Sequence, residues 1–212
     1  MIKINEIYQS IQGESTYAGL PCVFIRTTGC NLRCRWCDTE HAFEDGETCT
    51  LESILNTVRG FGCSLVEVTG GEPLLQTESL DLVRALLDEG YHVLIETSGA
   101  VPIQTVDRRA VLIIDLKCPG SGMTDAILWD NLNHLKPHDE VKFVIADQDD
   151  YDWAKDVLSG HQTLRGQTVH FSPVFGELPP QQLADWILRD RLPVRLQIQL
   201  HKHIWDPSMK GV

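Results

Sequence analysis

The stretch that decides the fold is Cys22-Val23-Phe24-Ile25-Arg26-Thr27-Thr28-Gly29-Cys30-Asn31-Leu32-Arg33-Cys34-Arg35-Trp36-Cys37. Its first part, Cys22–Thr28, is rich in apolar and β-branched residues, which is typical of a parallel strand covered on both faces. Its second part holds three cysteines at C-x3-C-x2-C spacing. The stretch therefore predicts a buried strand with a cysteine-rich loop directly after it.

Strand and helix patterns alternate along the rest of the chain. Further strands are predicted at Leu65–Thr69, Tyr91–Glu96, Val111–Leu116, Glu140–Ile145, Thr168–Ser172 and Val194–Leu200. Helices are predicted from Thr50 to about Arg59, from Thr77 to before Gly90, and over Thr124–Leu135, Asp149–Leu158 and Gln181–Arg189. Strands alternating with helices imply right-handed βαβ units.

About six such units predict an α/β fold, a partial (β/α) TIM-like barrel that forms one domain over residues 1–212. A doubly wound sheet is the alternative, because one sequence does not fix the order of the strands. The first residues, Lys3–Gln12, predict an additional N-terminal strand or hairpin before the barrel.

The composition excludes several classes of protein. The chain has 18 Lys and Arg against 30 Asp and Glu, a formal charge of -12, which argues against broad nucleic-acid binding. It has no apolar run of bilayer length and no apolar N-terminal segment, so we expect no membrane partner and a cytoplasmic location. In that reducing compartment seven cysteines indicate a metal site and buried thiols, not a disulfide framework.

Glycine and polar motifs stand just after the predicted strands. They are Thr28-Gly29-Cys30, Gly70-Gly71-Glu72-Pro73, Thr97-Ser98-Gly99, Lys117, Pro173 and His201-Lys202. In (β/α) barrels the carboxyl ends of the strands form the active site. We therefore expect these motifs to converge on one opening of the barrel.

The three clustered cysteines indicate a metal centre. Thiolates are the usual ligands of iron–sulfur clusters, and three ligands, Cys30, Cys34 and Cys37, leave one iron open for chemistry. A zinc site completed by His41 is the alternative, since Cys3His is a common zinc set. The downstream Gly70-Gly71-Glu72 segment favours the cluster, because glycines let the backbone approach a ligand and Glu72 can accept bonds from a cationic amine.

The cysteine loop and the Gly-Gly-Glu-Pro segment one βα unit later resemble the two hallmarks of the radical S-adenosylmethionine (SAM) superfamily. The resemblance implies a [4Fe-4S] cluster whose open iron is chelated by the methionine end of SAM. The strand ends and the cysteine loop then bind the cofactor. The implied residues are Trp36, Cys37, Asp38, Gly70, Gly71, Glu72, Glu96, Thr97, Ser98, Asp115, Leu116, Lys117, Ser172, Pro173, Val174 and Phe175.

Several segments narrow the resemblance to the 7-carboxy-7-deazaguanine synthase family over essentially the whole chain. They are Asn5–Glu14, Pro21–Leu32, Trp36-Cys37-Asp38-Thr39, Glu96-Thr97-Ser98-Gly99 and Gln199-Leu200-His201-Lys202. The family converts 6-carboxy-5,6,7,8-tetrahydropterin to 7-carboxy-7-deazaguanine with loss of ammonia, a carbon–nitrogen lyase step toward queuosine. The resemblance also implies Mg2+, a homodimer, and a flavodoxin- or ferredoxin-type reductant.

The resemblance implies a set of substrate-binding residues. Carboxylate and amide groups suit the 2-amino-4-oxo edge of a pterin, and a guanidinium suits its carboxylate. The implied residues are Gln12, Gly13 and Glu14 for the edge, Arg26 for the carboxylate, Thr69 between cofactor and substrate, His201, the terminal Val212, and Thr39 as the Mg2+ ligand. The chain departs from the family at Ser15, where the family usually has glycine.

Two other functions compete with this one. A glycyl-radical-enzyme activase would have a similar cysteine loop, but Gln12-Gly13-Glu14 and Arg26 speak against it. A non-catalytic zinc-binding module is the rival from another class.

Overall fold

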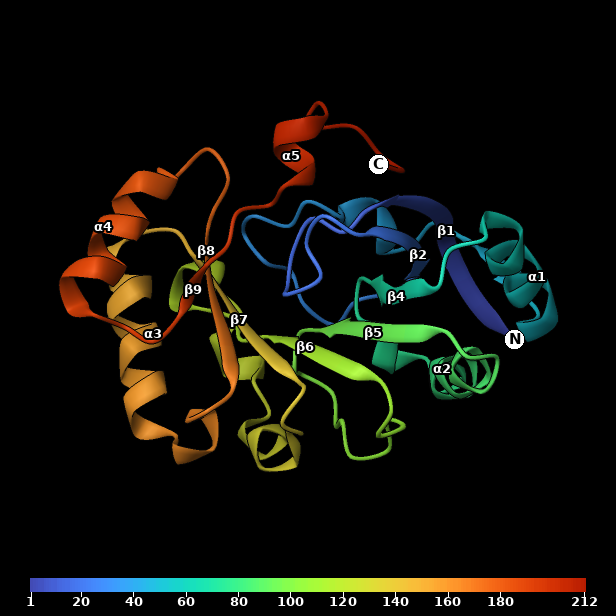
Figure 1. The fold of residues 1–212 in the computed structure, drawn as a ribbon, viewed down its shortest axis with the longest axis horizontal. Coiled ribbons are helices and arrows are strands. Elements are labelled where there is room, and N and C mark those ends of the chain that lie inside the picture. The colour runs from blue at the N-terminus through green and yellow to red at the C-terminus, as the bar shows by residue number, and fades with distance from the viewer.

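One sheet of nine strands forms the centre of the molecule in the computed structural model, which describes residues 1–212. The strands are β1 (Ile2–Ile11), β2 (Pro21–Thr27), β3 (Glu47–Cys49), β4 (Leu65–Gly70), β5 (His92–Thr97), β6 (Val111–Asp115), β7 (Glu140–Ile145), β8 (Thr168–Pro173) and β9 (Arg195–Leu196). Their order is β3-β1-β2-β4-β5-β6-β7-β8-β9, and every pair from β2 to β9 is parallel. Because the parallel strands follow chain order without reversal, the partial barrel is confirmed and the doubly wound alternative is wrong (Figure 1).

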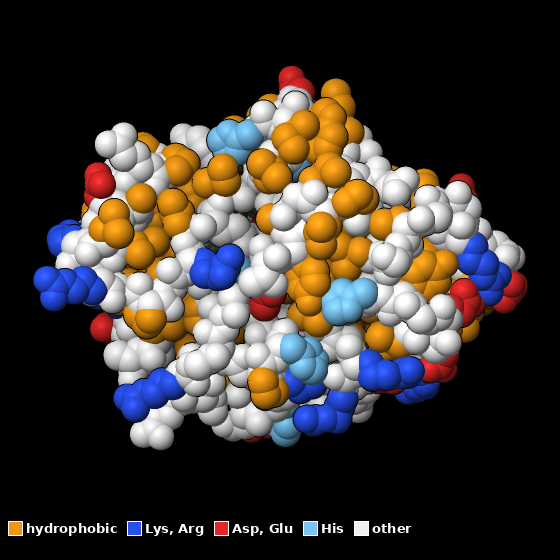
Figure 2. All heavy atoms as spheres, viewed as in Figure 1, with side chains coloured by type: hydrophobic (Ala, Val, Ile, Leu, Met, Phe, Trp, Pro, Cys, Tyr) orange, Lys and Arg blue, Asp and Glu red, His pale blue; other side chains and the backbone are white.

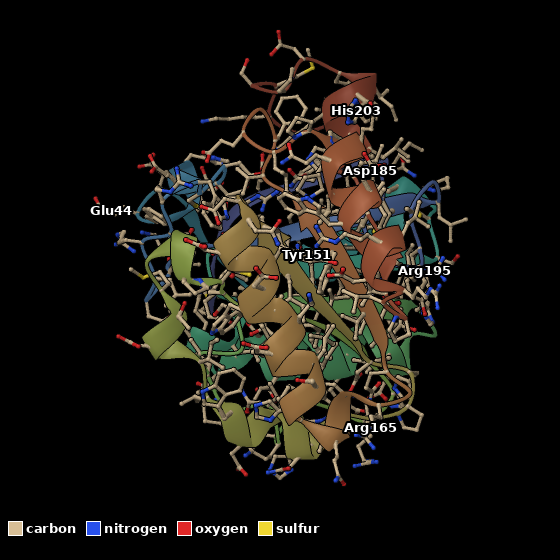
Figure 3. All side chains as sticks on the ribbon, turned by 90° about the vertical axis from the view of Figure 1, so that its left-hand side faces the viewer. Glu44, Tyr151, Arg165, Asp185, Arg195 and His203 are labelled. Atoms are coloured by element: carbon tan, nitrogen blue, oxygen red, sulfur yellow. The ribbon has the colours of Figure 1, made fainter.

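Helices cover the outer face of the sheet. They are α1 (Leu51–Phe61), α2 (Glu78–Asp88), α3 (Gln148–Gly160) and α4 (Pro180–Asp190). The short α5 (His201–Ile204) has no buried residue and lies apart from them, above the sheet (Figure 1). Figure 3 shows α3 and α4 side by side with Tyr151 between them, and the Tyr151 hydroxyl donates to the Trp186 carbonyl at 2.8 Å. None of the helices is long and apolar enough to cross a membrane.

Side-chain alternation along the strands produces two separate cores. The larger one lies between sheet and helices and includes Val66 and Val68 of β4. The smaller one has six residues on the opposite face of the strands, inside the barrel: Cys22, Phe24, Leu65, Leu94, Val111 and Ile113. This inner apolar cluster fills the barrel below the carboxyl ends of the strands, so the space above it is left for a site.

The N-terminal extension is a hairpin, as predicted. β1 pairs antiparallel with β2, and the loop between them is closed by the Gln12 N–H donating to the Leu20 carbonyl at 2.8 Å. Ser15 in this loop has φ 64°, a left-handed conformation that glycine adopts without strain. Its N–H donates to Gln197 Oε1 at 2.7 Å, so the serine departure leaves the turn in a glycine-like conformation held from the far end of the chain.

Two predicted elements are wrong. Thr124–Leu135 is not a helix but two short 3-10 turns, Thr124–Ala126 and Trp129–His134. Buried Asn131 explains this, because its amide donates to the Gly99 and Val101 carbonyls and accepts from the Ile103 N–H, and such side-chain bonds compete with a helix.

The predicted strand Val194–Leu200 shrinks to Arg195–Leu196. After one more backbone bond, Gln197 N–H to Phe171 O, the chain leaves the sheet and the Leu200 N–H donates to the Gly13 carbonyl. Contact with the N-terminal loop therefore replaces strand pairing in this segment.

We predict that Thr50→Ala lowers the free energy of unfolding by about 1 kcal/mol. The Thr50 hydroxyl accepts from the Ser53 N–H at 3.1 Å and caps α1, so alanine leaves that donor without its partner. Denaturant unfolding measures the loss. Thr77→Ala is the matched control, because Thr77 precedes α2 without a side-chain cap bond and its loss should stay within about 0.5 kcal/mol. Equal losses in the two variants would contradict the capping role of Thr50.

Candidate active site

The carboxyl ends of the parallel strands surround one cavity of about 420 Å³. It brings together most of the predicted site residues: Gln12, Gly13, Glu14, Arg26, Cys30, Cys34, Trp36, Cys37, Asp38, Thr39, Thr69, Gly70, Gly71, Glu96, Thr97, Ser98, Asp115, Lys117, Val174, Phe175, His201 and Val212. Four predicted residues, Glu72, Leu116, Ser172 and Pro173, do not line it. The convergence of the strand-end motifs on one opening is therefore observed, with those exceptions.

The cysteine loop lies at one end of the cavity. Cys30, Cys34 and Cys37 are half-buried free thiols. The loop is fixed against the Gly-Gly-Glu segment by the Glu72 N–H donating to the Gly29 carbonyl at 2.8 Å. A Cβ at Gly71 would stand 2.3 Å from that carbonyl and 2.7 Å from Cys30 Cβ, so only glycine permits this close approach.

The three thiols fit a cluster better than a single ion. No group of three His, Cys, Asp or Glu side chains is arranged to hold one metal ion. His41, the fourth ligand of the zinc alternative, instead has Nε2 3.5 Å from Glu6 Oε1. Three unpaired thiols spread along the wall of one cavity are the donor set that an iron–sulfur cubane with an open iron requires.

The predicted role of Glu72 needs correction. Its side chain is fully buried and does not line the cavity. Its two carboxylate oxygens accept from the Leu74 N–H, the Thr97 hydroxyl and both the N–H and hydroxyl of Ser98, at 2.6–3.1 Å. Four donors thus occupy the carboxylate, so Glu72 fixes Thr97 and Ser98 in the cavity wall, which Gly70 and Gly71 also line.

A buried lysine organises the opposite end of the cavity. Lys142 Nζ lies 2.8 Å from Glu14, contacts Glu96, and is 3.7 Å from Asp115. Burial works against the charge on Lys142, but the three carboxylates raise the pKa of its ammonium well above the usual value. Burial would also raise the pKa of Glu14, yet Lys142 lowers it overall, so this carboxylate stays ionised.

Sequence reasoning missed Lys142 and also Glu67. Both stand in strand patterns that are otherwise nearly apolar, Leu65-Val66-Glu67-Val68-Thr69 and Glu140-Val141-Lys142-Phe143. A charged residue in a strand covered on both faces was the available signal, since such residues are rarely buried without a partner. Glu67 accepts from Gln12 Nε2 at 2.5 Å, and burial, followed by repulsion from Glu96, raises its pKa to about 8.

Arg26, Thr39 and Asp38 lie along the wall between the two ends. Arg26 donates to Glu6 at 2.8 Å and to the Tyr8 hydroxyl at 3.0 Å, which leaves part of its guanidinium free. The Thr39 hydroxyl has only the Cys37 thiol as a neighbour, at 3.7 Å. Asp38 is already paired with Lys202 at 2.7 Å.

The C-terminal segment closes the cavity. Residues 207–212 line it, and Gln199 donates to Glu14 at 3.0 Å. A Cβ at Gly13 would stand 2.3 Å from His201 Nδ1, so the glycine lets the histidine pack against the N-terminal loop. His201 therefore packs against Gly13 from the other end of the chain, and Val212 lines the same cavity.

Comparison with known proteins relates this geometry to function. Residues 24–117 match the model of the Radical SAM superfamily. The chain is 48% identical to 7-carboxy-7-deazaguanine synthase of Chlorobaculum tepidum, over 100% of this chain and 97% of the relative, and 45% identical to that of Koribacter versatilis over both full lengths. The crystal structure of QueE from Escherichia coli shares the fold, with a TM-score of 0.79 at 24% identity over 94% of each chain.

We predict that Glu67→Gln raises the unfolding temperature by an amount that grows between about pH 5 and pH 8. The folded pKa of Glu67 is raised from 4.5 to about 8. In that window the unfolded chain has released a proton that the folded chain retains, so the parent protein loses stability as pH rises. Glutamine does not titrate, and the difference between the two melting curves isolates this one group. A difference that is constant with pH would contradict the raised pKa.

Proposed function

We propose, from the premise that this chain belongs to the 7-carboxy-7-deazaguanine synthase family of radical SAM enzymes, that its single cavity binds SAM at the cysteine end and the pterin substrate at the Lys142 end. The enzyme converts 6-carboxy-5,6,7,8-tetrahydropterin to 7-carboxy-7-deazaguanine on the route to queuosine. One observation supports the proposed arrangement above the others: three free thiols and a separate set of fixed polar groups share one cavity.

The cysteine end has the donors that the cofactor needs. Cys30, Cys34 and Cys37 would hold the [4Fe-4S] cluster, which with SAM supplies a radical that takes hydrogen from a substrate carbon. The backbone of Gly70–Gly71 would face the methionine end of SAM, and Thr97 and Ser98 its ribose, with Glu72 fixing both hydroxyls. Asp115, which lies between Lys142 and Lys117, has a buried Oδ1 that accepts no hydrogen bond within the chain.

The other end has acceptors and donors for a pterin. Glu14 stays ionised beside Lys142 and would accept from the N–H groups of the amino–oxo edge. Gln12 stands beside it, and Thr69 faces the middle of the cavity. The free part of the Arg26 guanidinium would pair with the substrate carboxylate, with Glu6 and Tyr8 holding the fork in place.

Thr39 fits a weak Mg2+ site that substrate oxygens complete. Its hydroxyl is free of strong partners, whereas the adjacent carboxylate of Asp38 is paired with Lys202. Burial would raise the pKa of Asp38, but Lys202 lowers it to about 2, which supports a lasting ion pair. Mg2+ commonly keeps waters and substrate oxygens beside few protein ligands.

The proposal includes two protein partners. Reductive cleavage of SAM needs an electron from outside, for which a flavodoxin- or ferredoxin-type protein is suited. A homodimer would cover exposed apolar side chains that gather around α4 and α5 (Figure 2). They are Leu188, Leu196, Ile198, Ile204 and Met209.

We predict that Cys34→Ala abolishes formation of 5′-deoxyadenosine from SAM. The expected cause is that loss of one of the three thiolates leaves the cluster with only two protein ligands. The measurement is anaerobic reconstitution with reductant, followed by chromatography of the nucleoside and assay of iron. Cys63→Ala is the control, since Cys63 lies outside the cavity and should keep full cleavage and iron content. Turnover at the parent rate in Cys34→Ala would remove the cluster assignment.

We predict that Mg2+ tightens substrate binding and that Thr39→Ala removes most of this effect. A neutral hydroxyl holds the ion weakly by itself, so ion and substrate should bind together, and their binding free energies must couple in both directions. Titration of substrate with and without Mg2+, in both proteins, measures the coupling. If the parent protein binds the substrate equally well in EDTA and in Mg2+, or if Thr39→Ala keeps the full Mg2+ effect, the proposed Mg2+ site is wrong.

A further inference from the structure

Glu67 occupies a position where the fold calls for an apolar residue. In the β-sheet register it lies between Phe24 of β2 and Leu94 of β5, both members of the inner apolar cluster. It is 4% exposed, and that small exposure is toward the cavity that Gln12 and Thr69 also line. Glu67 therefore lies where the inner apolar cluster ends and the cavity begins, at the end of the cavity proposed to bind the substrate.

No cation forms a salt bridge with the Glu67 carboxyl. The charge of Lys142 acts on Glu67 and opposes the rise in its pKa, but Lys142 is bonded to Glu14 and Glu96 instead. The one hydrogen bond of the Glu67 carboxyl is from the Gln12 amide. A buried carboxyl with one neutral partner destabilises the folded state relative to an apolar residue of similar size. Packing alone thus gives no reason for glutamate here.

The bond from Gln12 has a specific consequence for that residue. Gln12 Oε1 accepts from the Glu14 N–H at 3.0 Å, while Nε2 donates to Glu67 at 2.5 Å. Both ends of the carboxamide are therefore assigned: rotation by 180° would set its NH2 group against the Glu14 N–H, donor against donor, and would replace the N–H that Glu67 now accepts with an oxygen. One N–H of Nε2 and one lone pair of Oε1 remain for a ligand.

We propose that Glu67 is a positioning residue that fixes the orientation of the Gln12 carboxamide, so that its free N–H and C=O meet the adjacent acceptor and donor of the substrate's oxo–imino edge. This inference rests on the proposed binding of the pterin at the Lys142 end. An oxo group beside a ring N–H matches one orientation of the amide, and a 4-amino group beside an unprotonated ring nitrogen matches the reverse. Glu67 thereby sets discrimination against a 2,4-diamino analogue of the substrate.

The test compares Glu67→Leu with Glu67→Gln. The glutamine can still accept from Gln12 Nε2 and should bind substrate like the parent protein. The leucine removes the acceptor, so substrate binding should weaken about tenfold, the value of one hydrogen bond, and preference for the substrate over its 2,4-diamino analogue should fall by a similar factor. The unfolding temperature of Glu67→Leu should not fall, since a buried carboxyl has been removed.

Two further proteins separate positioning from a general structural effect. In a Gln12→Ala background Glu67→Leu should cause no additional loss of substrate binding, because Glu67 acts through Gln12. Val66→Ala, on the outer face of the same strand, should lower stability and leave the substrate preference unchanged. Glu67→Met provides a second apolar side chain of different shape.

The outcomes are distinct. Unchanged affinity and preference in Glu67→Leu, or an equal loss in the Gln12→Ala background, would overturn the inference, as would failure of both apolar variants to fold. A parent protein that does not bind or convert the pterin at all would instead overturn the proposed function.

Discussion

The substrate end of the cavity depends on one buried cation. Lys142 on β7 is reached by carboxylates from the loop after β1, from β5 and from β6. Each of these acids would be costly to bury alone, and so would the lysine, so burial of the four groups together stabilises each of them. Asp115 also pairs with Lys117 at 2.8 Å, so removing the Lys142 ammonium would leave Glu14 and Glu96 as the like charges without a bonded cation.

The cysteine end is held together by a different means. There the contacts are made mainly by the backbone. Gly71 has no side chain, so the backbone can approach Cys30 closely, and the Glu72 N–H donates to the Gly29 carbonyl. Glu72 itself is satisfied by neutral donors alone, two hydroxyls and two N–H groups. Backbone contacts and hydrogen bonds from neutral donors thus hold the loop that presents the three thiols, whereas ion pairs hold the polar groups around Lys142.

The order of the elements and the convergence of the motifs could be predicted from the sequence, because strand alternation and strand-end glycines are local signals. β7 was predicted at its observed bounds, and the helix predicted from Thr50 is α1, with Thr50 as its N-cap. The helix predicted over Thr124–Leu135 failed because Asn131 finds its partners in a loop some thirty residues away. Glu72 failed for a related reason, since its donors on Thr97 and Ser98 become neighbours only when β4 and β5 pair. Lys142 and Glu67 were visible as charges in apolar strands, but their partners depend on tertiary structure.

Because the last strand is short, the open barrel is closed by side-chain hydrogen bonds and not by strand pairing. β9 has only two residues, so strand pairing does not join the final unit of the sheet to the first. Side chains join them instead: Gln197 and Gln199 donate to Glu14, and the Leu200 N–H bonds to the Gly13 carbonyl. The residues that close the gap are thus the ones that orient Glu14 toward the cavity. The same hydrogen bonds hold both the C-terminal segment and Glu14, and Lys202 of that segment also pairs with Asp38, beside Cys37, at 2.7 Å. The C-terminal segment therefore contacts both ends of the cavity, and the two ends of the open sheet are joined through side chains that line the site.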